Sequence, residues 1–414
     1  MLQHILWGIT FFSLWLTIIW LHYLFEEEPR KKELKQKPTI TLAIPAFNEE
    51  KTIAKTVQSI TQSDYPADKI EIIIVDDCSK DNTSRKAQEI IAQNPAYNIK
   101  LLRHEQNKGK AAAVNTALDS ATGEYFAVVD ADSRIARDGI KLVLPYFYDE
   151  TIGAVISRVK VESPSKLIER IQYFEYIMSS MIRKLMAMLG TLHITPGVLS
   201  TYKTEVVRKV GGFTKDRNNL TEDMEIALRL ISNGYRIEMQ PESVTHTIVP
   251  KGLKKLWNQR IRWARGYIYN MWLYRRLMLS AKHGTFGLFQ MPINIIVVTT
   301  LIINVGIIMI NILDRSSEFL LRSATIQGYF IRRILDYPAI HTFVLGQNYR
   351  IMLPIIIATI LGFYLIWQSH KRFKESMLKN TTGIIAYFLF IPYFTTVNWI
   401  ASIFQEVMNT KRKW

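Results

Sequence analysis

Acidic side chains follow two apolar runs of the sequence. Asp77 comes just after the run 71–75, and Asp130 and Asp132 follow the run 125–129. Two carboxylates at positions i and i+2 at the end of a strand can hold one Mg²⁺ or Mn²⁺ ion while a diphosphate supplies further oxygen ligands. The alternative interpretation is a solvated turn whose aspartates cap the next helix, which is the more common outcome for an isolated pair.

Three further polar residues are candidates for a ligand site. Lys110 stands at the start of a predicted helix, where phosphates bind well. Glu222 and Asp223 open another predicted helix, 223–233, although the helix dipole alone also favours acids in a first turn. Together with the strand-end carboxylates, Lys110 predicts a pocket for a nucleoside diphosphate.

A basic and aromatic stretch, 251–276, contains Gln259, Arg262 and Trp263. This composition is typical of an amphipathic helix at a membrane surface, with Lys and Arg directed to headgroups and Trp at the boundary. A helix in that position can also close an active site, so the two interpretations are compatible.

The elements that must position these residues alternate between strand and helix. Apolar runs with no polar face predict strands, and the segments between them have helical spacing. Such strands imply a parallel sheet covered on both sides, in which ligands bind at the carboxyl ends of the strands. The predicted fold class is therefore α/β. The expected strands are 39–45, 71–75, 99–102 and 125–129, and the expected helices are 49–62, 82–93 and 110–121.

Long apolar segments predict a membrane protein, because about 20 apolar residues span a bilayer. The first segment lacks a basic leader and a small-residue cleavage site, so it predicts an uncleaved anchor rather than a signal peptide. Pro392 leaves open whether the last segment spans the membrane or breaks into a re-entrant piece. The four segments are 5–25, 282–314, 351–367 and 381–404.

The charge balance agrees with a membrane location. The chain has 52 Lys and Arg against 36 Asp and Glu, a net charge of +16. The basic residues flank apolar segments and no nucleic-acid recognition motif is present, so no nucleic-acid partner is expected. Basic residues at 30–37 are retained on the cytoplasmic side and predict a cytoplasmic catalytic domain in a multi-pass protein of the plasma membrane. One cysteine, Cys78, excludes an internal disulfide framework.

These features predict four regions. They are an N-terminal transmembrane anchor at 1–29, a cytoplasmic α/β domain at 30–250, interfacial amphipathic helices at 251–282, and a C-terminal transmembrane region at 283–414 with about three spans.

Six motifs in order resemble the family-2 inverting glycosyltransferases. More narrowly, they resemble the processive membrane synthases of cellulose, hyaluronan, chitin and, most of all, poly-β-1,6-N-acetylglucosamine. The resemblance implies a GT-A (Rossmann-like) glycosyltransferase domain joined to transmembrane helices. The motifs are Ala-Phe-Asn-Glu-Glu (46–50), Val-Asp-Asp-x-Ser (75–79), Asn-Lys-Gly-Lys (107–110), Asp-Ala-Asp (130–132), Thr-Glu-Asp (221–223) and Gln-x-x-Arg-Trp (259–263).

The resemblance implies a role for each matching residue on the donor side. Asp77 would contact the uridine of a UDP-sugar, and Asp130 and Asp132 would bind Mg²⁺ or Mn²⁺ and the diphosphate. Lys110 and Asn115 are further candidates for donor binding.

On the acceptor side, Asp223 would be the general base that deprotonates the acceptor hydroxyl, and Glu222 beside it is a substrate-binding candidate. Gln259, Arg262 and Trp263 would line the acceptor and the diphosphate. The family often has Gln at the position of Arg265, which is therefore expected to add charge near the acceptor.

The expected function is transfer of sugar from a UDP-sugar, UDP-N-acetylglucosamine first, to a growing polysaccharide with export across the membrane. A non-processive enzyme that adds one sugar to a lipid or polyprenyl acceptor is the alternative, and a catalytically silent membrane scaffold is a third hypothesis. The expected partners are the donor, the acceptor and membrane lipids. Because four spans are few for a channel, a small membrane partner subunit or a homo-oligomer is also expected.

Overall fold

The computed structural model describes residues 2–26, 37–335 and 349–412. The predicted boundary at residues 29 and 30 and the basic residues 30–35 lie outside these ranges. The strands are β1 Ile40–Ala46, β2 Ile70–Asp76, β3 Asn98–Arg103, β4 Tyr125–Val129, β5 Arg134–Ile135, β6 Ile152–Val161, β7 Val198–Lys203 and β8 Arg236–Thr247. The α-helices are α1 Leu2–Leu24, α2 Ile53–Thr61, α3 Thr83–Gln93, α4 Lys110–Ser120, α5 Gly139–Val143, α6 Leu167–Met188, α7 Thr204–Lys209, α8 Glu222–Ser232, α9 Leu253–Leu273, α10 Met291–Thr325, α11 Tyr329–Leu335, α13 Tyr349–Arg372 and α14 Thr381–Val407.

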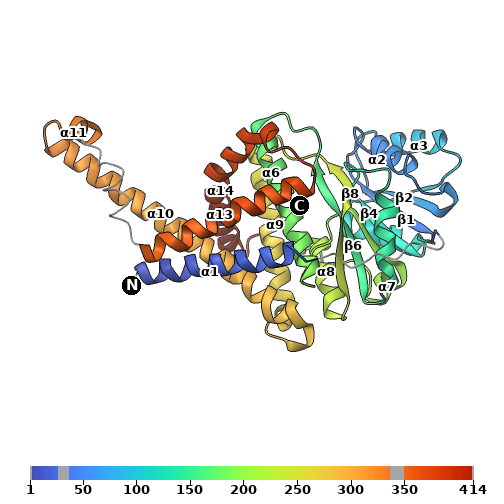
Figure 1. The fold of residues 1–414 in the computed structure, drawn as a ribbon. Helices are drawn as coiled ribbons and strands as arrows, with labels where there is room; N and C mark the ends of the chain where they lie inside the picture. Colours follow the sequence, from blue (N-terminus) through green and yellow to red (C-terminus); the bar gives the residue numbers. More distant parts are fainter. Residues whose placement is uncertain (1, 27–36, 336–348, 413–414) are drawn as a thin grey trace.

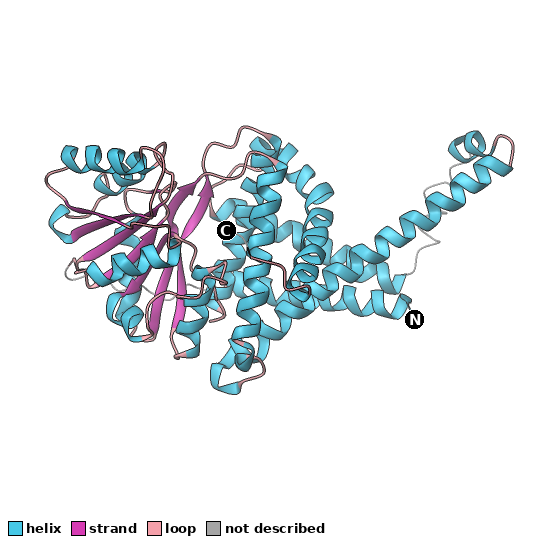
Figure 2. Ribbon diagram, turned by 180° about the vertical axis from the view of Figure 1, so that it is seen from behind, coloured by secondary structure: helices cyan, strands magenta, loops and turns pink. Residues whose placement is uncertain are grey.

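The strands of the described residues form one sheet in the order β3-β2-β1-β4-β7-β6-β8-β5. The first four run parallel, and β7 then runs antiparallel to both β4 and β6. Figure 2 shows helices on both faces of these strands. The sheet is therefore mixed, whereas the sequence predicted only its parallel half.

The central strand β2 explains why the parallel half was predictable. All of its residues are buried, and successive side chains pack into two different apolar cores. Ile72 and Ile74 pack with residues of α2 and α3, while Ile73 and Val75 pack with residues of α4. A strand covered on both faces has no polar face, which confirms the predicted α/β arrangement of this half.

The register of the parallel strands brings their carboxyl ends together. Ala46 at the end of β1 pairs with Asp76 at the end of β2, and β4 lies parallel to β1 on its other side. The chain after each of these strands therefore emerges at the same edge of the sheet. That edge holds the acidic motifs.

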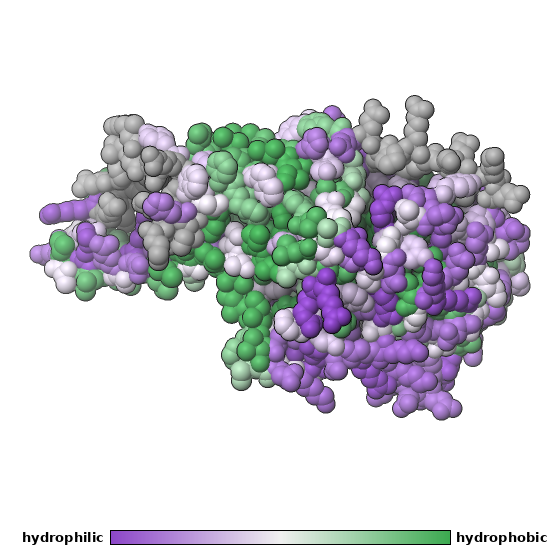
Figure 3. All heavy atoms as spheres, turned by 90° about the horizontal axis from the view of Figure 1, so that it is seen from below, coloured by the Kyte–Doolittle hydropathy of each residue, from purple (hydrophilic) through white to green (hydrophobic). Residues whose placement is uncertain are grey.

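Four helices in the described residues are long and apolar enough to cross a membrane. They overlap the four segments predicted from the sequence, and Figure 3 shows apolar residues gathered over this helical part, while hydrophilic residues cover the sheet. Pro392 lies inside α14, which runs unbroken from Thr381 to Val407, so the proline does not break this segment into separate pieces. The candidate spans are 7–24, 286–325, 352–372 and 378–407.

Two amphipathic helices connect the sheet with the candidate spans. Helix α6 packs against β6, β8 and α14, and α9 packs against α8 and α14. Figure 1 shows both helices between the sheet at one end of the molecule and the long helices at the other. The residues of α9 are therefore positioned by α8 and by a candidate span at once.

Candidate active site

A cavity of about 780 Å³ opens at the carboxyl edge of the parallel strands. Its wall comes from the ends of β1, β2 and β4, the loop before α4, the start of α4, Arg217 in the loop before α8, and one side chain of α9. The structure brings five of the predicted residues together here: Asp77, Lys110, Asp130, Asp132 and Arg262.

Lys110 joins two of the acidic motifs. Its Nζ lies 2.6 Å from Asp130 Oδ1 and 3.0 Å from Glu222 Oε1. Burial alone would lower the pKa of Lys110, but the charges of Asp130, Glu222 and Asp223 raise it above its usual value. The ammonium therefore stays charged at the cavity wall. Burial alone would raise the pKa of Glu222, but the charge of Lys110 keeps the pKa of that carboxyl below its usual value.

Gly197 lies against this ion pair. The backbone N–H of Asp130 donates a hydrogen bond of 2.6 Å to the carbonyl oxygen of Gly197. A Cβ atom at Gly197 would lie 2.5 Å from Asp130 Oδ1 and 2.6 Å from Lys110 Nζ, so only glycine leaves room for the pair. The Pro196-Gly197 dipeptide was the only sequence signal for this contact.

Three carboxylates share the cavity wall near the end of β4. Burial, followed by the charges of Asp130 and Glu49, raises the pKa of Asp132 to about 7. Burial also raises the pKa of Glu49, with a further contribution from Asp130. No cluster of three His, Cys, Asp or Glu side chains within the described residues is already close enough to hold a metal ion. These carboxylates are nevertheless hard oxygen donors that repel one another. A divalent cation would neutralise their excess negative charge, so the residues fit such an ion.

Asp77 shapes the loop that precedes α4. Its Oδ1 accepts a hydrogen bond of 2.8 Å from the N–H of Lys108, and its Oδ2 accepts one of 2.7 Å from the N–H of Gly109. His104 Nδ1 lies 2.7 Å from Asp77 Oδ1, and His104 Nε2 lies 2.9 Å from Thr116 Oγ1. Most of the hydrogen-bonding capacity of Asp77 is thus used inside the protein. His104 was not predicted, because no motif marks it.

Asp223 lies in the first turn of α8, next to Glu222 rather than on the wall of the cavity. Its Oδ1 accepts a hydrogen bond of 2.8 Å from the N–H of Met224. Burial, with the neighbouring charge of Glu222, raises the pKa of Asp223 to about 6, while Lys110 and Arg262 act in the opposite direction. A carboxylate with a pKa just below neutral is well matched to accepting a proton at neutral pH.

Helix α9 is held against α8 by a close contact. A Cβ atom at Gly266 would lie 2.4 Å from Thr221 Oγ1, and the side chain of Asn270 donates to the same oxygen at 2.9 Å. This contact fixes the Gln-x-x-Arg-Trp residues relative to the Thr-Glu-Asp residues. Arg262 consequently reaches the cavity wall.

The remaining residues of the α9 motif lie away from that wall. The guanidinium of Arg260 lies 4.4 Å from the ring centroid of Trp263 and pairs with Glu175 of α6 at 2.7 Å. Gln259 Oε1 is buried with no hydrogen-bond partner among the described residues. Arg183, also on α6, interacts electrostatically with Asp223 and Glu175. None of these α6 contacts was predicted from the sequence.

The structure gives Asn115 a different position from the one predicted. It does not line the cavity at the strand ends. Its Nδ2 donates to the carbonyl oxygen of Phe213 at 3.0 Å, and its Oδ1 accepts from the N–H of Phe213 at 2.8 Å. The amide holds the 211–213 turn, and Asn115 lines a neighbouring cavity that shares Lys110 with the cavity at the strand ends. The predicted donor contact stays a prediction.

Asn115→Ala should therefore reduce stability and leave donor affinity unchanged. The substitution leaves two backbone groups of the buried Phe213 without partners, at a cost of about 1–3 kcal/mol for each buried unsatisfied group. Thermal unfolding of the purified protein in detergent would measure the loss. A variant that melts like the wild type but binds donor weakly would restore the predicted role.

Arg265 also departs from its predicted place. Its side chain is buried, with Nε 2.5 Å from Glu406 Oε1 and Nη2 2.8 Å from the carbonyl oxygen of Thr410. Arg265 therefore links α9 to the end of α14 instead of adding charge beside an acceptor.

Comparison with known proteins agrees with the predicted fold and family resemblance. Residues 41–211 match the family described as glycosyl transferase family 2. Among solved structures, a mannosyltransferase from Pyrobaculum calidifontis, in complex with GDP-Man and Mn²⁺, superposes with a TM-score of 0.57 at 26% identity, covering 67% of this chain and 76% of that one.

Two curated relatives are poly-β-1,6-N-acetyl-D-glucosamine synthases. The enzyme of Staphylococcus aureus strain COL is 30% identical over 270 residues, or 62% of this chain and 64% of the relative. The enzyme of Staphylococcus epidermidis is 28% identical over 277 residues, or 64% of this chain and 66% of the relative. The chain thus covers slightly less than two thirds of the length of these relatives.

Proposed function

We propose that this chain, in which residues 41–211 are a family-2 glycosyltransferase domain, transfers a sugar from a UDP-sugar to a growing polysaccharide. The carrying observation is the arrangement at the carboxyl edge of the sheet. A cavity with Lys110 and Arg262 on its wall suits a diphosphate, and Asp223, a carboxylate with a raised pKa, lies beside it. The names of the synthase relatives favour UDP-N-acetylglucosamine as the donor.

On the donor side, the chain must stabilise negative charge as the nucleoside diphosphate leaves. Lys110 and Arg262 place two fixed positive charges on the cavity wall, and preorganised charge of this kind often contributes more to catalysis than any other single effect. Asp130 and Asp132, with Glu49 nearby, would hold Mg²⁺ or Mn²⁺, which when bound neutralises charge on the diphosphate.

On the acceptor side, Asp223 accepts the proton of the acceptor hydroxyl. The electron pair that this leaves on the acceptor oxygen forms a bond to the anomeric carbon. The bond from that carbon to the phosphate oxygen breaks, and UDP departs with the electrons of that bond. One base and no carboxylate nucleophile suit a single displacement with inversion.

Residues of α9 and α6 suit an acceptor sugar. The buried Oε1 of Gln259 lacks a partner among the described residues and can accept a hydrogen bond from a sugar hydroxyl. The ring of Trp263 can stack on a sugar, with its other contact to Arg260. Because both helices also pack on α14, the acceptor side faces the candidate spans, which supports export of a polymer across the membrane.

The experiment uses the purified full chain in nanodiscs with Mg²⁺ or Mn²⁺ and a panel of radiolabelled UDP-sugars. Products are sized by gel and tested for organic extraction. High-molecular-weight, water-soluble product from UDP-N-acetylglucosamine is expected. Label confined to an organic-extractable product would assign transfer of one sugar to a lipid acceptor, and no transfer from any donor would favour a silent scaffold.

The rate of transfer should depend on the protonation of Asp223. Its raised pKa means that the base form is lost at higher pH than for an ordinary aspartate, so kcat should fall about tenfold per pH unit below about pH 6. Product formation at saturating donor, measured from about pH 5 to about pH 8, gives the profile. A kcat that stays level to about pH 5 would remove Asp223 as the base.

Gly197→Ala should weaken donor binding without unfolding the protein. The new Cβ would meet the flexible ends of Asp130 and Lys110, which can move, but only by giving up the geometry of their ion pair. Overpacking costs about 1–3 kcal/mol, so we expect UDP affinity to fall about 5- to 100-fold in a titration. Gly252→Ala is the matched control because its Cβ meets open space. Equal affinity in the two variants would contradict the prediction.

A further inference from the structure

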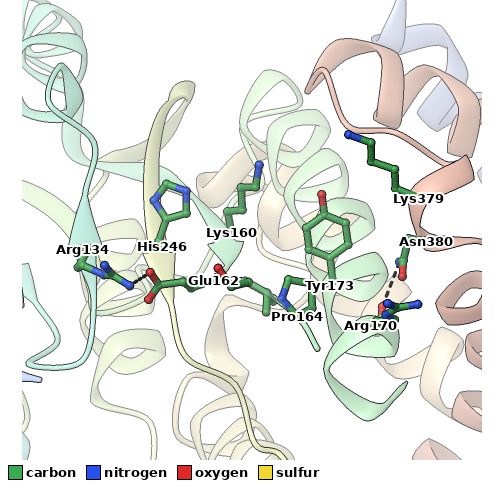
Figure 4. A pocket seen from close by; sticks show the side chains of 11 residues that line it. Arg134, Lys160, Glu162, Pro164, Arg170, Tyr173, His246, Lys379 and Asn380 are labelled. Atoms are coloured by element: carbon green, nitrogen blue, oxygen red, sulfur yellow. Dashed lines mark hydrogen bonds and ion pairs between the residues drawn. The ribbon is translucent and has the colours of Figure 1, made fainter. Parts of the chain in front are cut away.

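A second cavity, of about 530 Å³, lies where the sheet meets the membrane helices. In Figure 4, Arg134, Lys160 and His246 reach it from the sheet, whereas Lys379 and Asn380 reach it from the helical side. None of the described residues that line this cavity lines the donor cavity. A ligand bound here would therefore be distinct from the donor.

The cavity has an excess of positive charge. Glu162 pairs with Arg134. The buried carboxylate of Glu375 lies 2.7 Å from Lys160 Nζ and 3.3 Å from Arg158 Nη1. These two acids therefore already form ion pairs with the three cations on the sheet side, which are Arg134, Arg158 and Lys160.

The two cations on the helical side lack an acidic partner among the described residues. In the part of the chain that the structure describes, neither Arg170 nor Lys379 forms an ion pair. Among the described residues, the guanidinium of Arg170 donates only to the hydroxyl of Thr382, at 3.3 Å. Two cations that line one cavity and have no carboxylate partner among the described residues are suited to an anion with several oxygen atoms, because guanidinium and ammonium groups bind phosphate strongly.

A neutral hydrogen-bonding group completes the wall. Burial, and then the charges of Lys160, Arg134 and Arg158, lower the pKa of His246, while Glu375 acts weakly in the opposite direction. His246 is therefore uncharged at neutral pH and can donate one hydrogen bond or accept one.

The cavity lies at the end of a candidate span. Lys379 and Asn380 belong to the short helix Leu378–Asn380, directly before α14, and residues 378–407 are apolar enough to cross a membrane. The side chain of Asn380 donates to the carbonyl oxygen of Arg170 at 3.1 Å, which fixes the start of the span against α6. A membrane around α14 would place its headgroups at the level of Lys379 and Arg170.

We propose that this cavity binds the phosphate headgroup of an anionic membrane lipid, with Arg170 and Lys379 as its main charged contacts. A negatively charged leaflet attracts cations near its surface, and the phosphate oxygens supply the acceptors that these two side chains lack. The bound headgroup would tie α6 and the sheet to the start of α14. This inference concerns binding alone and stands whether or not the donor is a UDP-sugar.

The test measures lipid binding by the full chain in detergent. Short-chain phosphatidylglycerol and phosphatidylcholine are titrated separately, with UDP and Mg²⁺ present so that the donor cavity is filled. Arg170→Gln with Lys379→Gln should weaken phosphatidylglycerol binding about tenfold or more, since each cation near an anionic surface contributes measurably. Lys371→Gln with Lys374→Gln, the same charge change outside the cavity, should alter binding by less than about threefold. Phosphatidylcholine should bind weakly to every protein.

Several results would overturn the proposal. One is equal phosphatidylglycerol affinity in the wild type and the cavity variant, and another is an equal loss in the cavity and control variants. If inorganic phosphate displaces the lipid when the phosphate concentration is below the lipid concentration, the cavity would be assigned to a soluble anion. If the double variant unfolds, Lys379→Glu decides the matter, because this exposed side chain can change without disturbing packing and should still abolish the preference for phosphatidylglycerol.

Discussion

Asp223→Asn should reduce turnover by about 10²–10⁴-fold, the usual contribution of a general base, while donor affinity changes by less than about threefold. Asparagine keeps the size and the contact with the N–H of Met224 but cannot take a proton from the acceptor. Asp223 does not line the donor cavity, and Lys110 keeps its two acidic partners, Asp130 and Glu222. The loss should therefore appear in kcat and not in binding.

Initial rates at saturating donor and acceptor, together with UDP titration, separate the two effects. Asp119→Asn provides the control, because it makes the same chemical change on an exposed residue of α4. Turnover in the Asp223 variant that stays within about fivefold of the control would assign the base elsewhere. A parallel loss of UDP affinity would instead mean that Asp223 helps to hold the donor side together.

The part of the fold that could be predicted is the part whose burial leaves a mark in the sequence. Strand β2 is apolar at nearly every position because it is covered on both faces, so its place in a parallel sheet followed directly. Strand β8 has exposed or half-buried residues between buried ones, and β7 is inserted between β4 and β6 by a long-range pairing. Neither feature is visible in a local pattern.

The candidate spans show the same difference between local and distant information. All four were predicted from length and apolar composition, but α10 continues to Thr325, beyond the expected end at 314. The extension is polar and is helped by an ion pair between Glu318 and Arg322, one turn apart. Apolar composition predicts which part of a helix can lie in a membrane. It does not predict the residue at which the helix ends.

The site was predicted to the extent that its residues occur in motifs. The residues at the strand ends follow from the sequence, because a parallel sheet brings such positions to one edge. The residues at the start of α8 were expected at the site only from the family resemblance. Gly197, His104 and Arg183 belong to the same region but contact it across long stretches of chain. Asn115 shows what a motif leaves open, since its motif neighbour Lys110 reaches the cavity while its own amide holds a turn.

Asp132→Ala should remove most of the metal dependence of donor binding. With Asp130 engaged by Lys110, Asp132 is the carboxylate of the Asp-Ala-Asp motif that has no cationic partner within hydrogen-bond distance among the described residues. Losing it removes an oxygen ligand that a divalent ion needs, so UDP affinity in Mg²⁺ or Mn²⁺ should fall about tenfold or more, equivalent to about 1.4 kcal/mol.

The measurement is UDP titration with and without the divalent ion. Without metal, the variant should bind UDP at least as well as the wild type, because it no longer presents to the diphosphate a carboxyl group that is partly ionised at neutral pH. Asp138→Ala, which removes a carboxylate outside the cavity wall, should keep the full metal effect. Both expected results have one cause. Asp132 repels the diphosphate when no metal is present, and it attracts the diphosphate through the ion when metal is bound. Unchanged UDP affinity across the metal titration would exclude Asp132 as a ligand and leave Lys110 and Arg262 as the principal charges on the donor.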